Sequence, residues 1–204
     1  MTLALDPVIP QTVINVGHSV PAAALTDRRL AEWARAHGVS VTVCDDEGLN
    51  AVQRHRIRPF QVVCRCGPVT AISRRAVGLG VRRFIVDTAH QMARLDECAA
   101  KTLYLYLDDR APLMLGDRRL KVIGLHADVE DGGTGADFAT AARALVRRAA
   151  ILQACGSSVQ RIALSGGPTG GLREDWLRAL DRSICEECQE QRIPLPRVTV
   201  LTRP

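Results

Sequence analysis

Two side chains that can exchange protons, His126 and Asp128, lie two residues apart in the run Val122-Ile-Gly-Leu-His-Ala-Asp-Val-Glu-Asp-Gly-Gly133. The aliphatic start of this run is typical of a strand, and its acidic, glycine-rich end predicts a loop. Because side chains alternate along a strand, both groups should point to the same side near its carboxyl end. The pair predicts either acid–base catalysis or a histidine packed as part of the fold, and both interpretations stay open.

A second strand-like run, Arg161-Ile-Ala-Leu-Ser-Gly-Gly-Pro168, also ends in glycine. Glycine lets the backbone approach an anion closely, and the amino terminus of a following helix favours negative charge. Ser165, Gly166 and Gly167 are therefore candidate cofactor-binding residues for a phosphate or carboxylate group. A glycine pair is also common in tight turns between a strand and a helix, so the turn remains the alternative.

Imidazole, thiol and carboxylate groups that could together bind zinc fall near several predicted strand ends, where they would share one rim. They are His18, Cys44, Cys64, Cys66, His126 and Asp128. Zinc sites usually have closely spaced pairs of ligands, and the single pair Cys185-Glu-Glu-Cys188 stands alone, so no metal site is predicted. His18, at the end of the first predicted strand, stays a candidate catalytic group.

The elements that must position these groups alternate regularly along the chain. Strands are predicted at 12–17, 39–44, 60–65, 81–87, 102–107, from 122, at 161–164 and at 198–201. Helices are predicted at 21–37, 45–52, 69–77, 88–98, 137–155 and around 176–184, whereas 112–119 is irregular. A unit of about 20–25 residues predicts the α/β class and a single compact (β/α)8 TIM-type barrel over residues 1–204. An open doubly wound sheet is the alternative.

Composition limits the partners of the protein. Of 204 residues, 47% are hydrophobic and 24% charged, which is ordinary for a globular protein. The net charge of +5 is scattered, and only two Trp, two Tyr and three Phe are present, so we expect no nucleic-acid partner. No apolar run is long enough to span a membrane, and no secretory signal is visible, so we expect a cytoplasmic protein with reduced thiols.

Four stretches together resemble the barrel of the fold-type III pyridoxal-phosphate (PLP) decarboxylases, the diaminopimelate and ornithine decarboxylase group. They are Val39-Ser-Val-Thr-Val-Cys-Asp-Asp-Glu-Gly-Leu49, Gly80-Val-Arg-Arg-Phe-Ile-Val-Asp-Thr88, Val122-Ile-Gly-Leu-His126 and Leu164-Ser-Gly-Gly-Pro168. The order and spacing of these motifs match the family, and weaker similarity extends over nearly the whole chain. The resemblance implies a barrel that holds PLP at the carboxyl ends of its strands.

The chain departs from this family at the residues that the cofactor requires. The family's first strand ends in a lysine that binds the PLP aldehyde, whereas this sequence reads Val16-Gly-His-Ser19 there. The family's second histidine on strand six is Asp128 here, and its strand-two acid is Thr42. The glutamate segment after strand eight is reduced to Thr202-Arg-Pro204, and we expect the family's C-terminal β-domain to be missing.

The sequence therefore predicts a degenerate relative, or pseudoenzyme, of the PLP decarboxylases. We expect it to bind a partner protein or a small anionic ligand, with a homodimer or a heterodimer with a catalytic homologue implied by the resemblance. No cofactor follows from the residues, although the resemblance implies PLP. The alternative is an active PLP-dependent amino-acid decarboxylase or racemase-like enzyme.

Overall fold

The computed structural model describes residues 14–130, 133–157, 159–166 and 174–202. Its strands are β1 (Ile14–Pro21), β2 (Ser40–Val43), β3 (Val62–Arg65), β4 (Arg83–Val86), β5 (Leu103–Asp108), β6 (Leu120–Val129), β7 (Arg161–Gly166) and β8 (Arg197–Thr202). Its α-helices are α1 (Arg28–His37), α2 (Asp46–Arg54), α3 (Thr70–Gly78), α4 (Ala89–Cys98), α5 (Gly135–Ala154) and α6 (Glu174–Gln191). Within these ranges no helix has the length and apolar character needed to cross a bilayer.

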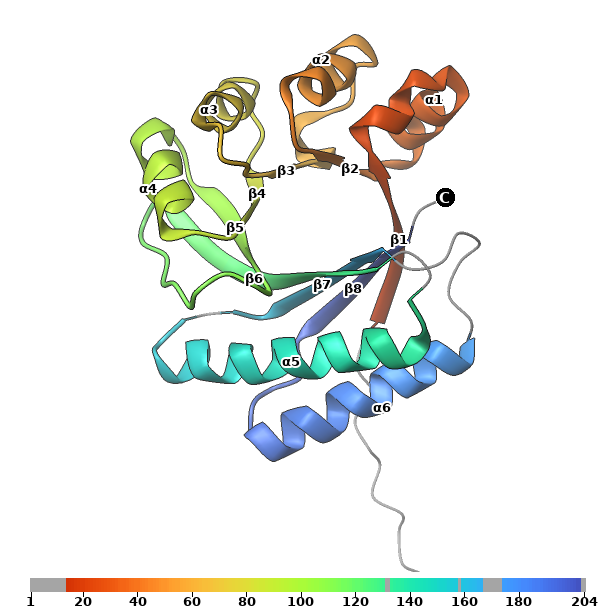
Figure 1. The fold of residues 1–204 in the computed structure, drawn as a ribbon, viewed down its shortest axis with the longest axis vertical. Coiled ribbons are helices and arrows are strands. Elements are labelled where there is room, and N and C mark those ends of the chain that lie inside the picture. Colours follow the sequence, from red (N-terminus) through yellow and green to blue (C-terminus); the bar gives the residue numbers. More distant parts are fainter. Residues whose placement is uncertain (1–13, 131–132, 158, 167–173, 203–204) are drawn as a thin grey trace, which may run out of the picture.

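The eight strands close into one barrel, in which each strand is parallel to its neighbours and β8 pairs with β1. Helices α1 to α4 surround β1 to β5, while α5 lies along β6 to β8 and α6 packs on the outside of α5 (Figure 1). The predicted (β/α)8 barrel is confirmed, and the open sheet is excluded. In such a barrel the carboxyl ends of all strands meet at one face, which is where barrel enzymes place their active sites.

Local signals set most boundaries close to the predicted ones, but the first unit differs. β1 continues to Pro21 instead of ending near Gly17, and a short 3-10 helix, Ala22–Thr26, follows it. The helix predicted from residue 21 begins only at Arg28, because the Asp27 side chain accepts hydrogen bonds from the first free amides of α1. The extra length of β1 changes which of its side chains reach the carboxyl face.

The barrel has an apolar outside and a largely polar inside. Along each strand, residues that line the interior alternate with fully buried aliphatic residues that face the helices; in β2, for example, Ser40 and Thr42 face inward and Val41 and Val43 face outward. Phe84 and Phe138 are among the largest buried side chains in this outer layer. The hydrophobic core therefore lies between barrel and helices, and polar and charged side chains can line the interior of the barrel.

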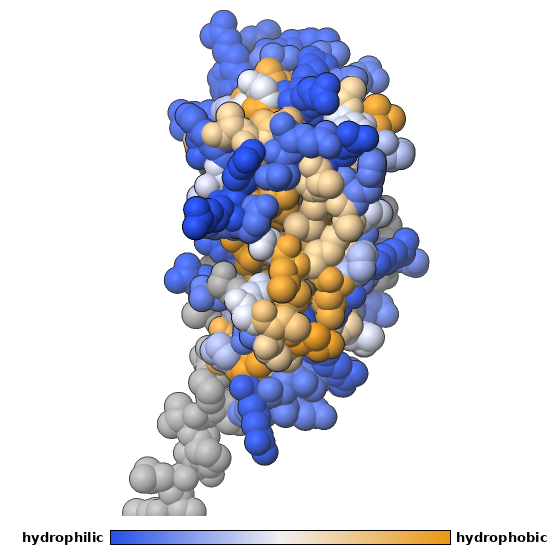
Figure 2. Space-filling view, turned by 90° about the vertical axis from the view of Figure 1, so that its left-hand side faces the viewer, coloured by the Kyte–Doolittle hydropathy of each residue, from blue (hydrophilic) through white to orange (hydrophobic). Residues whose placement is uncertain are grey.

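The connection between β5 and β6 has no helix, as the sequence predicted. Segment 109–119 crosses this side of the barrel as turns and bends between α4 and the carboxyl end of α5 (Figure 1). Figure 2 turns the same side to the viewer and shows an apolar band between hydrophilic side chains. Leu113, Leu115 and Ile151 are exposed large hydrophobic residues of these elements, with 40%, 54% and 51% exposure.

Candidate functional site

The barrel encloses a cavity of about 500 Å³. All eight strands contribute to its lining, which consists of Ser19, Pro21, Ser40, Thr42, Val63, Arg65, Arg83, Ile85, Tyr106, His126, Asp128, Val129, Glu130, Arg161, Ala163, Ser165, Gly166, Thr199 and Leu201. A cavity of this volume is large enough for a small-molecule ligand. Charged groups face it both at the carboxyl ends of the strands and at their amino-terminal ends.

Arg65, the last residue of β3, is at the centre of a polar cluster near the carboxyl ends of the strands. Its Nη1 donates to Oδ2 of Asp108 at 2.9 Å, and its Nη2 donates to Asp128. The same Nη2 lies 3.3 Å from Nδ1 of His126. The Arg65 side chain is 30% exposed and that of Asp108 only 8%, so water screens their ion pair incompletely. Arg65 therefore holds two carboxylates from different strands in fixed positions.

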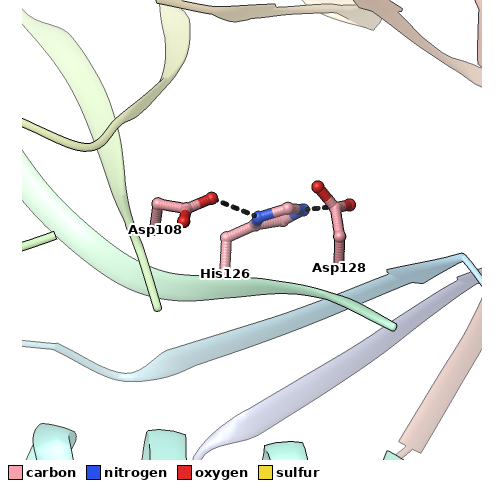
Figure 3. A group of neighbouring side chains, drawn as sticks. All are labelled: Asp108, His126 and Asp128. Carbon is pink, nitrogen blue, oxygen red and sulfur yellow. Dashed lines mark ion pairs between the residues drawn. The ribbon is translucent and has the colours of Figure 1, made fainter. Parts of the chain in front are cut away.

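His126 lies between the two carboxylates (Figure 3). Its Nε2 is 2.8 Å from Oγ of Ser165, and that hydroxyl donates to Asp128. Nδ1 of His126 lies 3.5 Å from Oδ2 of Asp108, and Nε2 lies 3.5 Å from Oδ1 of Asp128, so each ring nitrogen faces a carboxylate. Because the Ser165 hydroxyl donates its proton to Asp128, the geometry orients Ser165 but does not direct that proton to His126, as activation of a nucleophile by the imidazole would require.

The carboxylate of Asp108 is held in its charged form. Burial alone would raise the pKa of Asp108, but hydrogen bonds from His126 and Asp109 act against it. The backbone amide of Arg110 and the charge of Arg65 add to these hydrogen bonds, and together they lower the pKa of Asp108 below its usual range. For the adjacent Asp109, burial and the bond to Asp108 raise the pKa.

The cluster also contains the donor set of a metal site. Ligand atoms of Asp108, His126 and Asp128 lie within 4.8 Å of one another. However, the guanidinium of Arg65 is already bonded to both carboxylates, and a cation would have to displace it against charge repulsion. The arrangement therefore favours an ion-pair network over a metal centre.

The structure brings three of the predicted candidates together and separates one. His126, Asp128 and Ser165 share the cavity mouth, as the strand pairing Asp128↔Ser165 requires. His18 instead lies outside the barrel, with its ring centroid 5.5 Å from that of Trp33 in α1. Because β1 is longer than predicted, His18 is a mid-strand residue whose side chain alternates with the inward-facing Ser19. The expectation that His18 lies on the rim was wrong.

The thiols expected on the rim do not line the cavity either. Cys64 and Cys66 are buried in the layer between barrel and helices, with 0% and 4% exposure. Burial raises the pKa of both thiols, that of Cys66 to about 11, so they stay protonated at neutral pH. Cys44 is exposed but is also not part of the cavity lining. The alternation of side chains in β3 explains why these groups do not meet His126.

The glycines after Ser165 have a packing explanation in the described part of the loop. Gly166 has φ of +100°, a conformation that favours glycine, and a Cβ at this position would lie 2.0 Å from the carbonyl oxygen of Val129. The close approach of β6 and β7 therefore requires glycine here. Gly167 lies outside the described residues, so the anion-binding interpretation of Ser165–Gly167 stays a prediction.

Sequence reasoning missed the two residues that organise the cluster, Arg65 and Asp108. Both are the last residues of apolar strands, which is the position where barrels place functional side chains. That signal was present in the sequence, but arginine is abundant in this chain, and the pattern does not show which arginine faces inward. The pairing Asp108↔His126 between β5 and β6 places the two side chains next to each other.

PLP, the cofactor implied by the resemblance, does not fit the residues of this cavity. Its aldehyde requires a lysine amine, and lysine occurs in the sequence only at Lys101 and Lys121. Lys101 precedes β5 and Lys121 is the second residue of β6, so both lie at the amino-terminal end of the barrel, outside the cavity lining. Ser19 and Pro21 are the residues of β1 that line the cavity, and the Ser19 hydroxyl lies 3.1 Å from that of Thr42.

Comparison with known proteins gives structural matches alone. No family profile and no curated protein sequence match the chain. Among solved structures, diaminopimelate decarboxylase from M. jannaschii in complex with L-lysine superimposes with a TM-score of 0.72 at 12% identity, over 93% of this chain and 53% of that protein. The arginine decarboxylase of Paramecium bursaria Chlorella virus bound to agmatine gives 0.70 at 11% identity, over 96% and 58%.

A third solved structure also matches this chain in fold at low sequence identity. Lysine decarboxylase from Selenomonas ruminantium superimposes with a TM-score of 0.67 at 10% identity, over 97% of this chain and 62% of that protein. The chain thus spans about half the length of the first decarboxylases that it matches. The resemblance seen in the sequence is confirmed for the fold: the chain has the barrel fold of the PLP-dependent diaminopimelate, arginine and lysine decarboxylases.

Proposed function

We propose that this barrel is a non-catalytic relative, or pseudoenzyme, of the PLP-dependent decarboxylases and that it binds a small ligand in its interior. The observation that carries the proposal is the absence of lysine from the described lining of the cavity, combined with a cavity volume of about 500 Å³. Without a lysine amine the cavity cannot bind the aldehyde of PLP covalently, as decarboxylase chemistry requires. The polar side chains of the cavity can still orient a small ligand.

The charge of the cavity mouth supports the loss of the cofactor. Asp128 and Glu130 line the mouth, the buried Asp108 lies beside it on Arg65, and the charge of Arg65 balances only one of these three carboxylates. A phosphate group bound nearby would experience repulsion of about 1–4 kcal/mol for each close pair of like charges. The mouth is therefore suited to groups that are neutral or positively charged.

A reconstitution experiment tests this proposal. The purified protein is mixed with one equivalent of PLP, absorbance is followed for imine formation, and borohydride is added before peptide mass spectrometry. We expect no stoichiometric adduct on Lys101 or Lys121. The matched variant Ser19→Lys places an amine at the inward position of β1 and should form a reducible imine if the missing lysine is the cause. A stoichiometric adduct on the unaltered chain, or decarboxylation of lysine, arginine or diaminopimelate with PLP present, would refute the proposal and favour the active enzyme.

A specific observation also supports a protein partner, in the form of a second copy of this chain. The apolar band over segment 109–119 and the end of α5 leaves Leu113, Leu115 and Ile151 exposed on one side of the barrel (Figure 2). Contiguous exposed apolar residues are typical of interaction surfaces. Light scattering should give the mass of a dimer for the unaltered chain and of a monomer for Leu115→Glu. A monomer in both cases contradicts this part of the proposal.

A further inference from the structure

The inner end of the cavity, at the amino-terminal ends of the strands, is lined by two arginines for which the described residues supply no acidic partner. Arg83 is the first residue of β4 and Arg161 the first of β7. Within the same part of the chain, Arg83 donates to the carbonyl oxygen of Phe60, and its Nε has no hydrogen-bond partner. Arg83 is partly buried, and partly buried cations are normally paired, whereas Arg161 is exposed to solvent. The described lining of this end therefore has two positive charges and no negative one.

The two guanidinium groups also act on each other. Burial lowers the pKa of Arg83; the nearby Tyr106 acts in the opposite direction, and the charge of Arg161 lowers the pKa further. Two like charges that face one cavity repel each other, and an anion bound between them would remove this repulsion. The inner end therefore has the electrostatic properties of an anion-binding site.

A glycine keeps this end open. Gly124 of β6 pairs with Tyr106 on one side and with Arg161 on the other. A Cβ on Gly124 would lie 2.7 Å from the Tyr106 ring and 2.8 Å from the carbonyl oxygen of Arg161, so the ring occupies the space of the missing side chain. Because Gly124 has no side chain, the Tyr106 ring lies against β6 at this position and leaves the cavity open.

The outer end has the opposite charge. Asp128 and Glu130 line the mouth, and Arg65 pairs with Asp128 and with the buried Asp108 beside the lining, so these three carboxylates and one guanidinium sum to a formal charge of −2. The inner end has +2, from Arg83 and Arg161. Arg161 and Ser165 are four residues apart on β7, which corresponds to about 13 Å along the strand. Allowing for the reach of the side chains from both ends, the bound groups would be roughly 6–9 Å apart.

We propose that the cavity binds a small ω-amino carboxylate, with its carboxylate between Arg83 and Arg161 and its ammonium group near Asp128 and Glu130. This inference rests on the proposed function, because it requires a barrel that holds a ligand in place of a cofactor. The charge separation selects a linear zwitterion of about five or six carbons, and no α-amino group is needed. A diacid would place one negative end at the negative mouth, and a diamine would place one positive end between the arginines.

Calorimetric titration with three six-carbon probes tests the inference: 6-aminohexanoate, adipate and 1,6-diaminohexane. We expect 6-aminohexanoate to bind at least about tenfold more tightly than either symmetrical probe. Arg161→Met should weaken its binding about tenfold or more, and Glu130→Gln by a smaller factor. Arg197→Met is the matched control, because Arg197 pairs with Arg161 at the same end of the barrel but does not line the cavity.

Three results would overturn the inference: no binding of 6-aminohexanoate, equal binding of adipate or the diamine, or an equal loss in Arg197→Met and Arg161→Met. Its failure is distinguishable from failure of the proposed function. If the unaltered chain forms no imine with PLP and also fails to bind the zwitterion, the inference fails alone. If an imine forms on the unaltered chain, the proposed function fails first.

Discussion

Replacement of Arg65 by methionine should show how much the polar cluster contributes to stability. Methionine keeps most of the aliphatic packing and removes the guanidinium, which leaves the carboxylates of Asp108 and Asp128 on either side of His126 without their shared partner. Removing one partner of a fully buried pair costs about 3–5 kcal/mol. Because Arg65 is 30% and Asp128 56% exposed, water screens part of the interaction, and we expect a loss of about 2–3 kcal/mol at neutral pH.

The loss should also depend on pH, because the pKa of Asp108 is lower in the folded protein than the value of about 3.9 expected for an unfolded chain. The contribution of Asp108 to stability is therefore present above about pH 4 and disappears as pH falls through the folded pKa. The cost of Arg65→Met should accordingly be largest near neutral pH and should decrease below about pH 4.

Urea unfolding, followed by tryptophan fluorescence at about pH 7 and at about pH 2–3, below the unfolded pKa of Asp108, measures both quantities. Arg28→Met is the control, since the Arg28 side chain is 86% exposed and pairs with Glu32 one helical turn away. Such a surface pair contributes about 0.5 kcal/mol or less. If Arg65→Met costs no more than Arg28→Met, or costs more in acid than at neutral pH, the cluster does not stabilise the folded barrel through its ion pairs.

Other predictions address the layer between barrel and helices. Iodoacetamide should label the exposed Cys155 first in the native protein, while Cys66, whose pKa burial raises to about 11, should react only after unfolding; early labelling of Cys66 in peptide mass spectra would contradict this assignment. Phe138→Ala removes a side chain that is 1% exposed and should lower the free energy of unfolding by about 3–5 kcal/mol, measured by urea titration. Gly135→Val should lower it by about 1–3 kcal/mol, because a Cβ at Gly135 already lies 2.7 Å from the ring of Trp176; an unchanged midpoint would show that α5 and α6 can separate freely.

Several parts of the site were predictable because they depend on local pattern. The strand beginning at Val122 places His126 and Asp128 on one face, and the period of two that governs strands guarantees this wherever the strand lies. Gly38 caps the end of α1 and Thr88 caps the beginning of α4, close to the predicted helix boundaries at residues 37 and 88. Such signals act over a few residues, and tertiary contacts did not alter them.

Other parts could not be predicted because they depend on the phase of alternation. Whether His18 or Ser19 faces the cavity is decided by where β1 begins and ends, and its four added residues at the carboxyl end follow from pairing with β2. The sequence also does not distinguish Arg83 and Arg161 from the many other arginines of this chain. Only the closed barrel shows that these two side chains line the cavity. A shift of one residue in a strand would have reversed each of these orientations.

By itself, then, the sequence determined that the chain alternates strands and helices, that it resembles the PLP decarboxylase barrel, and that the run from Val122 carries a histidine and an aspartate on one side. Only the closed barrel decided what those two groups meet. Arg65 from β3 and Asp108 from β5 reach His126 because the parallel strands bring residues 43 and 61 positions apart to one end of the cavity. Which charged side chains share the cavity is decided only when the strands close into a barrel. Their arrangement makes one end of the cavity negative and the other positive.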